Sequence, residues 1–213
     1  MHVILDFDGT LVDSKGFIIE IYNSVSKGKK RPHITDEIFG KLSKMSIFKR
    51  LKHFDTSLRE VTKIFREIEN VYYENAGRVR LFNGIKELIE EIAKKHTLYI
   101  LSTNTIRVIR KVMQDHLLDS YFTDFYTNRN LLGKAGSLKK ILRKNSISAF
   151  DTVYIGDEER DIIASKKVKV KSLAVSWGYD SKALLGSVKP DYIVDEPGEI
   201  KEILGMMEAD VKS

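Results

Sequence analysis

The sequence predicts an α/β protein, with a doubly wound parallel sheet and an inserted α-helical subdomain. Two observations support this prediction. Short apolar runs alternate with amphipathic helical segments over most of the 213 residues, as in parallel sheets covered on both faces. One stretch, from about Ser14 to about Arg80, breaks the alternation and contains helical patterns without a convincing strand.

Five apolar runs are predicted as buried strands because each is short and ends in polar residues or glycine. They are 3–5, 98–101, 153–155, 172–175 and 192–194. Apolar residues at helical spacing predict amphipathic helices between or after these runs. The three clearest sets are Ile85, Leu88, Ile89 and Ile92, then Leu138, Ile141 and Leu142, then Ile200, Ile203, Leu204 and Met207.

The stretch without strands is too long to be a loop. Apolar residues keep a 3-4 spacing from Leu58 to Tyr72, which predicts a long helix, and a shorter helix is predicted from Phe17 to Val25. We therefore expect a core formed by residues 1–13 and 80–213 and an inserted helical subdomain formed by residues 14–79.

Composition excludes several classes of protein. The chain has no cysteine, so it contains no disulfide and no thiolate metal site. Its N-terminal segment lacks the features of a signal peptide, and no apolar run approaches the ~20 residues of a membrane span. We expect a soluble, cytoplasmic protein. The net charge of +6 comes from basic residues spread along the chain, which favours a solvated surface over an anion-binding patch.

The first predicted strand is followed by Asp6-Phe7-Asp8-Gly9-Thr10. Asp6 and Asp8 are two positions apart, so an extended backbone points both carboxylates the same way. Ligands of an open α/β sheet bind beyond the carboxyl ends of its strands. Two carboxylates there suit phosphoryl transfer, in which one attacks and the other moves a proton. The alternative is an Asp-Gly turn that closes a surface loop.

A second acidic segment, 156–161, follows the predicted strand 153–155 and contains Asp157 and Asp161. Carboxylates are the hard oxygen ligands that suit Mg²⁺. The alternative is an ordinary helix N-terminus, where the helix dipole favours acidic residues.

Two weaker signals involve polar and basic groups. Ser102-Thr103-Asn104 follows the predicted strand 98–101, where a hydroxyl and a backbone N–H can donate to a phosphate oxygen. The alternative is an N-cap for a helix starting near Ile106. Lys134 begins the helix that precedes the strand 153–155 and could neutralise a phosphate, or it could be one solvated lysine among many. Its surroundings do not form a Walker motif, since no Ser or Thr follows Lys134 directly.

These four signals lie at or near the same edge of one predicted sheet, and together they resemble a known family. The segments 6–14 and 156–162 are similar to motifs of the haloacid dehalogenase superfamily of phosphatases, and the resemblance covers about 1–13 and 80–205. Ser176-Trp177-Gly178-Tyr179 and Pro190-Asp191-Tyr192 resemble its phosphoglycolate phosphatase branch. Dehalogenases of the superfamily lack an acid at the second Asp position, so Asp8 favours phosphate chemistry.

The resemblance implies a Rossmann-like core with a helical cap, Mg²⁺ as cofactor, and a role for each candidate residue. Asp6 would form an aspartyl-phosphate, and Asp8 would protonate the leaving group and then activate water. The implied metal ligands are Asp6, the backbone carbonyl of Asp8, Asp157, and Asp161 nearby or through water. The implied phosphate-binding residues are Thr103, Asn104 and Lys134, with Ser102 open as a substitute for Thr103 and Lys139 or Lys140 for Lys134.

The function expected from the sequence is Mg²⁺-dependent hydrolysis of a small phosphomonoester, with phosphoglycolate as one candidate. Basic residues of the insertion, among them Lys44, Lys49 and Arg50, could meet a substrate carboxylate or a second phosphate, or they could form a solvated helix face. The alternatives are a phosphomutase, a phosphonate hydrolase with a Schiff-base lysine in the cap, or a nucleic-acid-binding protein that removes a terminal phosphate. No nucleic-acid motif supports the last one. The sequence does not decide the oligomeric state.

Overall fold

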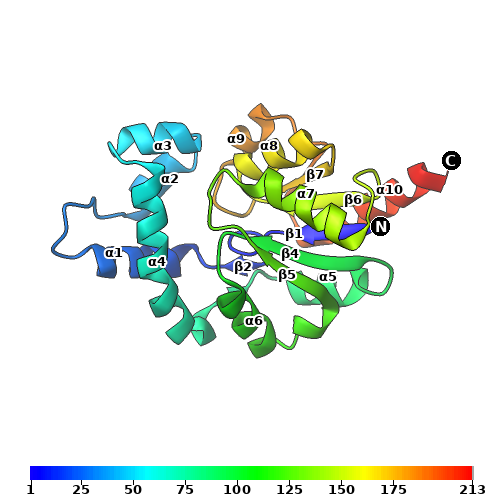
Figure 1. Ribbon diagram of the computed structural model, residues 1–213, viewed down its shortest axis with the longest axis horizontal. Helices are drawn as coiled ribbons and strands as arrows, with labels where there is room; N and C mark the ends of the chain where they lie inside the picture. Colours follow the sequence, from blue (N-terminus) through cyan, green and yellow to red (C-terminus); the bar gives the residue numbers. More distant parts are fainter. Residues whose placement is uncertain (213) are drawn as a thin grey trace.

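A computed structural model describes residues 1–212 and centres on a six-stranded sheet of order β5-β4-β1-β6-β7-β8 (Figure 1). Every strand pair in this sheet is parallel. The strands are β1 (His2–Leu5), β4 (Thr97–Ser102), β5 (Phe122–Thr127), β6 (Thr152–Gly156), β7 (Lys171–Val175) and β8 (Tyr192–Val194). From β1 the chain adds strands first on one side and then on the other, which confirms the predicted doubly wound sheet.

The five predicted strands are all present, each within a residue or two of its expected ends. The sixth, β5, was not predicted. Its sequence, Phe-Thr-Asp-Phe-Tyr-Thr, contains no apolar run, because its two buried aromatic residues are separated by Thr and Asp. Phe122 and Phe125 enter the core, whereas Thr123 and Thr127 are exposed.

Six helices cover the two faces of the sheet. They are α5 (Ile85–Ile92), α6 (Ile106–Asp115), α7 (Lys134–Asn145), α8 (Glu159–Val168), α9 (Lys182–Ser187) and α10 (Pro197–Lys212), with short 3-10 turns η1 (Ala76–Arg78) and η2 (Asp119–Tyr121). Alternate residues of one strand serve opposite faces. Val3 and Leu5 pack in the cluster that includes α5, α6 and α10, whereas Ile4 packs with α7 and α8.

The inserted segment folds into four helices that lie beside one edge of the core (Figure 1). They are α1 (Lys15–Ser26), α2 (Asp36–Leu42), α3 (Ile47–His53) and α4 (Leu58–Glu74). Ser57 begins α4 with a capping box to Glu60, which explains where this long helix starts. A two-stranded antiparallel ribbon of β2 (Val12–Asp13) and β3 (Arg80–Leu81) joins the two ends of the insertion.

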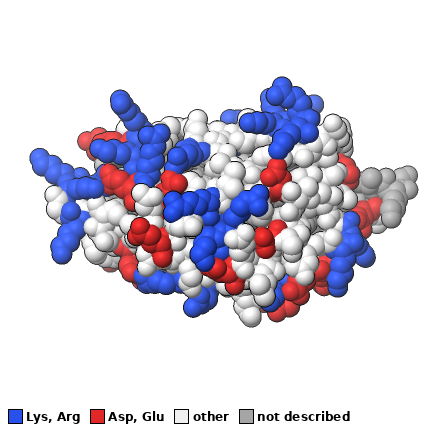
Figure 2. All heavy atoms as spheres, turned by 60° about the horizontal axis from the view of Figure 1, so that its bottom comes forward, with Lys and Arg blue, Asp and Glu red and all other residues white. Residues whose placement is uncertain are grey.

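Basic and acidic side chains are interspersed on the molecular surface. Figure 2 shows Lys and Arg at several separate places on one face, with Asp and Glu between them. Several of these surface charges form ion pairs, such as Lys29 with Glu67 and Lys144 with Asp124. None of the helices in the described part of the chain combines the length and apolar character that a membrane span requires.

We expect Ile89→Ala to lower the free energy of unfolding by about 2–5 kcal/mol, because Ile89 of α5 is fully buried in the core and its loss leaves a cavity. Urea denaturation followed by circular dichroism would measure the change as a lower midpoint. Phe150→Ala is the control, since Phe150 is 80% exposed and should change stability by no more than about 0.5 kcal/mol. Equal losses in the two variants would contradict the described core.

Candidate active site

The candidate residues meet at the carboxyl end of the three central strands. β1 pairs with β4 on one side and with β6 on the other, so the segments that follow these three strands are neighbours. Asp6 follows β1, Thr103 follows β4, and Asp157 follows β6. A crevice at this place, where the chain switches direction across the sheet, is the usual ligand site of an open α/β fold.

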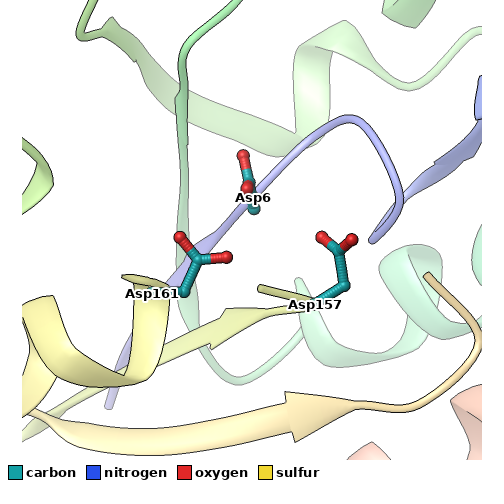
Figure 3. Close-up of side chains that lie close together, drawn as sticks. All are labelled: Asp6, Asp157 and Asp161. Atoms are coloured by element: carbon teal, nitrogen blue, oxygen red, sulfur yellow. The ribbon is translucent and has the colours of Figure 1, made fainter. Parts of the chain in front are cut away.

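Asp6, Asp157 and Asp161 form a buried group of carboxylates whose oxygen atoms lie within 4.8 Å of one another. Figure 3 shows the three side chains converging from the end of β1, the end of β6 and the first turn of α8. Burial raises the pKa of Asp6 to about 7 although Lys134 opposes the shift, and burial raises the pKa of Asp157 well above its usual range. An all-oxygen cluster of this kind fits a hard divalent cation.

Lys134 is the cation that this cluster contains. It is the first residue of α7, is 1% exposed, and places Nζ 2.5 Å from Oδ2 of Asp6 and 2.5 Å from Oδ1 of Asp161. Burial lowers the pKa of Lys134, but the carboxylates of Asp161 and Asp6 outweigh burial and hold the pKa above its usual value. The two substitutes considered from the sequence, Lys139 and Lys140, are exposed on the same helix.

The carboxylate of Asp8 belongs to a different environment from the other three. It accepts a hydrogen bond from the Tyr72 hydroxyl at 2.8 Å and one from the Asn104 side-chain amide at 2.9 Å. Burial raises the pKa of Asp8, and these two hydrogen bonds partly offset the shift. Asp8 therefore lies two residues after Asp6 but carries its carboxylate toward the helical insertion, where Tyr72 of α4 holds it.

The three residues after Leu101 have distinct positions. Thr103 lines a cavity together with Asp8 and Asn104. Ser102 is buried, and its hydroxyl accepts a hydrogen bond from the backbone N–H of Asn104 at 3.0 Å. The N-cap of α6 is Thr105, so capping does not account for the residues before it.

Backbone geometry brings Asp157 close to the loop after β1. Gly9 has a φ of +79°, and a Cβ at this position would overlap the Asp157 carboxylate. The turn therefore requires glycine for two reasons, the backbone conformation and the lack of space for a side chain. The Thr10 hydroxyl and the Tyr179 backbone N–H each donate to that carboxylate at 2.8 Å. The position of Asp157 is thereby fixed from two segments far apart in the sequence.

The cavity beside Asp8 has a volume of about 50 Å³ and lies between the core and α4. Its walls include Thr62, Arg66 and Glu69 of α4 and Arg129 from the loop after β5. Arg129 forms an ion pair with Glu69 across the two subdomains. Among the described residues, Arg66 has no acidic partner within 4.0 Å.

Several contributors to the site were not predicted from the sequence. Tyr72 was interpreted as an apolar core position of the long helix, and its hydroxyl gave no separate signal. Arg50 was suggested as a substrate contact, but it pairs with Asp180 and approaches Glu158 at 3.8 Å, which ties α3 to the core. Lys44 and Lys49 do not line the cavity beside Asp8.

Taken together, the structure shows an α/β fold with a buried cluster of carboxylates at the carboxyl edge of a parallel sheet. The family model of the haloacid dehalogenase-like hydrolases matches residues 3–175, and the chain belongs to this family. The match confirms the predicted family and fold. It also confirms the predicted enzyme class, a phosphoric monoester hydrolase.

The chain is similar over nearly its full length to proteins with related names. A phosphoglycolate phosphatase from Synechococcus elongatus is 25% identical, with 93% of this chain and 94% of that protein covered. A pyrophosphatase PpaX from Bacillus mycoides is 22% identical, with 95% of each chain covered. The solved structure of a haloacid dehalogenase-like family protein from Streptococcus pneumoniae matches with a TM-score of 0.79 at 23% identity and covers 95% of this chain and 97% of its own.

We expect Mg²⁺ to raise the melting temperature, because a cation that binds the folded carboxylate cluster stabilises it by mass action. At a concentration of 100 times the dissociation constant, the shift should be about 5–10 °C. Asp157→Asn should abolish most of this shift. Asp151→Asn is the matched control, since Asp151 lies near Met1 at the other end of the sheet. An equal Mg²⁺ shift in all three proteins, measured by differential scanning fluorimetry, would exclude binding at the cluster.

Proposed function

We propose that this enzyme hydrolyses small anionic phosphomonoesters through an aspartyl-phosphate on Asp6, with Mg²⁺ as cofactor. The observation that carries the proposal is the convergence of three different groups at one edge. Asp6 lies beside the buried Lys134, and Asp8, held by Tyr72 and Asn104, faces a separate small cavity. A nucleophile, a charge-neutralising cation and a proton donor are the groups that phosphoryl transfer requires.

In the first step, an oxygen of Asp6 forms a bond to phosphorus while the bond from phosphorus to the ester oxygen breaks. Asp8 gives its proton to the departing oxygen, so the product leaves as an alcohol. In the second step, Asp8 takes a proton from water as that water attacks phosphorus, and the carboxylate of Asp6 is released. Burial raises the pKa of Asp8, which helps it to retain the proton it must donate.

Mg²⁺ would neutralise phosphate and carboxylate charge in the site. The proposed ligands are Asp6, Asp157, Asp161 and the backbone carbonyl of Asp8, and the buried cluster of three carboxylates supports this set. The proposed phosphate-binding residues are Lys134, which adjoins Asp6, and Thr103, which lines the cavity. Asn104 was grouped with them, but its side-chain amide donates to Asp8, which favours a role in orienting the acid.

The inserted helices, within residues 14–79, would act as a cap over a core of residues 1–13 and 80–213. Tyr72 and Arg66 of α4 already line the cavity beside Asp8, so this helix is placed to exclude water and to contact the leaving group. The cytoplasm is the compartment expected for an enzyme of this kind.

The leaving group is proposed to be short and negatively charged. The cavity of about 50 Å³ admits few atoms. Of the charged side chains that line it, Arg129 pairs with Glu69 and Asp8 is the proposed proton donor, whereas Arg66 has no acidic partner within 4.0 Å among the described residues. The names of the similar proteins, phosphoglycolate phosphatase and pyrophosphatase, both refer to small anions. The leaving groups to compare are therefore glycolate, which leaves from an ester, and a second phosphate, which leaves from an anhydride in place of the alcohol. Among the described residues that line this cavity, the insertion contributes no lysine, which disfavours a phosphonate hydrolase with a Schiff-base lysine.

Asp6→Asn should abolish hydrolysis of every phosphomonoester while the far-UV circular dichroism stays unchanged, because the amide keeps the size of the side chain and loses its nucleophilic charge. Removal of divalent metal with EDTA should abolish wild-type turnover, and added Mg²⁺ should restore it. Phosphate release measured with a panel of esters tests both. Turnover at the wild-type rate in Asp6→Asn would refute the aspartyl-phosphate mechanism.

Arg66→Ala should lower kcat/KM for phosphoglycolate or pyrophosphate by about ten- to a hundredfold, since a hydrogen bond to a charged group contributes about 1.5–3 kcal/mol. The same variant should change kcat/KM for an ester with an uncharged leaving group, such as methyl phosphate, by less than threefold. Arg59→Ala is the matched control, because Arg59 is an exposed arginine of α4 that lines neither described cavity. If Arg66→Ala lowers kcat/KM equally for esters with charged and with uncharged leaving groups, Arg66 does not bind the charge of the leaving group.

A further inference from the structure

The insertion contains a second cavity that the proposed reaction does not use. It has a volume of about 470 Å³, whereas the cavity beside Asp8 has about 50 Å³. Ligand cavities for small molecules commonly measure about 300–1,000 Å³, so the second one is large enough to hold an organic group. One water needs about 10–15 Å³, so the first admits a group of only roughly four heavy atoms.

Three apolar side chains line both cavities and therefore separate them. They are Ile18 of α1 and Phe65 and Ile68 of α4. Ile68 is 6% exposed and Phe65 is 39% exposed, so Ile68 is fixed in the core whereas Phe65 is the more accessible part of the partition.

The partition lies on the same stripe of α4 that reaches the proposed acid. Phe65, Ile68 and Tyr72 follow one another at spacings of three and four residues, which places them on one face of the helix. At a rise of 1.5 Å per residue, Phe65 lies about 10 Å along the helix from Tyr72, whose hydroxyl bonds Asp8. A leaving group that extended along α4 from the site would meet Phe65 at the entrance to the larger cavity.

Both cavities combine apolar and charged side chains, and they differ mainly in size. The walls near Asp8 include Thr62, Arg66 and Glu69. The larger cavity has an extensive apolar lining, which includes Ile19, Tyr22, Phe39, Leu42, Val61 and Ile64. It also has charged side chains, which include Lys29, Lys30, Arg31, Asp55, Glu60 and Lys63. An apolar chain would be stabilised in the larger cavity by burial of its surface, but it has to pass the partition first.

We propose that Phe65, backed by Ile18 and Ile68, is the specificity-determining residue that limits the length of the leaving group. With the ring in place, the site accepts short polar leaving groups. Without the ring, the cavity beside Asp8 joins the larger one, and phosphate compounds with an extended alkyl chain are accommodated. This inference rests on the proposed function, because it takes Asp8 as the group next to the leaving oxygen.

Binding of non-hydrolysable phosphonates tests the partition without depending on turnover. Isothermal titration calorimetry in Mg²⁺ would compare methylphosphonate and n-octylphosphonate. The wild type should bind methylphosphonate at least tenfold more tightly than n-octylphosphonate. Phe65→Ala should bind n-octylphosphonate at least tenfold more tightly than the wild type does, and Phe65→Leu should be intermediate. Affinity for methylphosphonate should change by less than threefold in both variants.

Two further variants locate the alkyl chain. Phe48→Ala removes an equally large ring that is 62% exposed on α3 and lines neither cavity, so it should leave both affinities unchanged. Val61→Trp fills the larger cavity alone, and combining it with Phe65→Ala should cancel the gain for n-octylphosphonate. A gain that persists in the double variant, or equal binding of n-octylphosphonate by the wild type and Phe65→Ala, would overturn the proposal.

Hydrolysis of methyl phosphate and n-octyl phosphate shows which of the two proposals is wrong, the role of Phe65 or the hydrolytic function. If the wild type hydrolyses methyl phosphate but Phe65→Ala gains no activity toward n-octyl phosphate, the partition is wrong and the phosphatase stands. If no protein hydrolyses any ester while the calorimetric pattern holds, the hydrolytic function is wrong and Phe65 still separates the two cavities.

Discussion

The ion pairs of Lys134 with Asp6 and Asp161 are the interactions on which the site depends. Three carboxylates buried within 4.8 Å of one another repel strongly in a medium of low dielectric constant, and the fold tolerates them only where positive charge lies among them. Lys134 provides such a charge from the first turn of α7. The first turn of α7 is therefore fixed beside β1 by electrostatics as well as by packing.

Acidic side chains in the loops around the carboxylate cluster are also paired with positive charges. Glu158 and Arg160, which lie between Asp157 and Asp161 in the sequence, form an ion pair next to the carboxylate cluster. Arg160 also donates to the backbone carbonyl of Leu131, just before α7. On the opposite side, Asp180 accepts from the backbone N–H of Glu159 and pairs with Arg50 of the insertion. A chain of charge pairs thus runs from the core to α3, so the insertion and the buried acids share one electrostatic network.

The sequence allowed the core and its acidic residues to be predicted because each left a local signal. A buried parallel strand is a short apolar run, and the carboxylates directly after β1 and β6 needed only the rule that strand ends meet at one edge. β5 lacked such a signal, since its buried residues Phe122 and Phe125 are separated by Thr123 and Asp124 and form no apolar run. The roles of Tyr72 and Arg50 had no local sequence signal either. The partner of Tyr72, Asp8, is 64 positions away, and the partner of Arg50, Asp180, is 130 positions away, so only the docking of the insertion brings each pair together.

The central position of β1 has a consequence for how this protein forms. His2 pairs with Thr97 on one side and with Thr152 on the other, so the strand that precedes Asp6 has no partner nearby in the chain. In the sequence, β1 precedes its partner β4 by about 95 residues and its partner β6 by about 150, so neither pairing can form until the later strand has been synthesised. The helices of the insertion, whose backbone hydrogen bonds are local, need no distant partner to begin forming. Asp6, Asp157 and Asp161 therefore come together late, when loop closure over long distances has been completed.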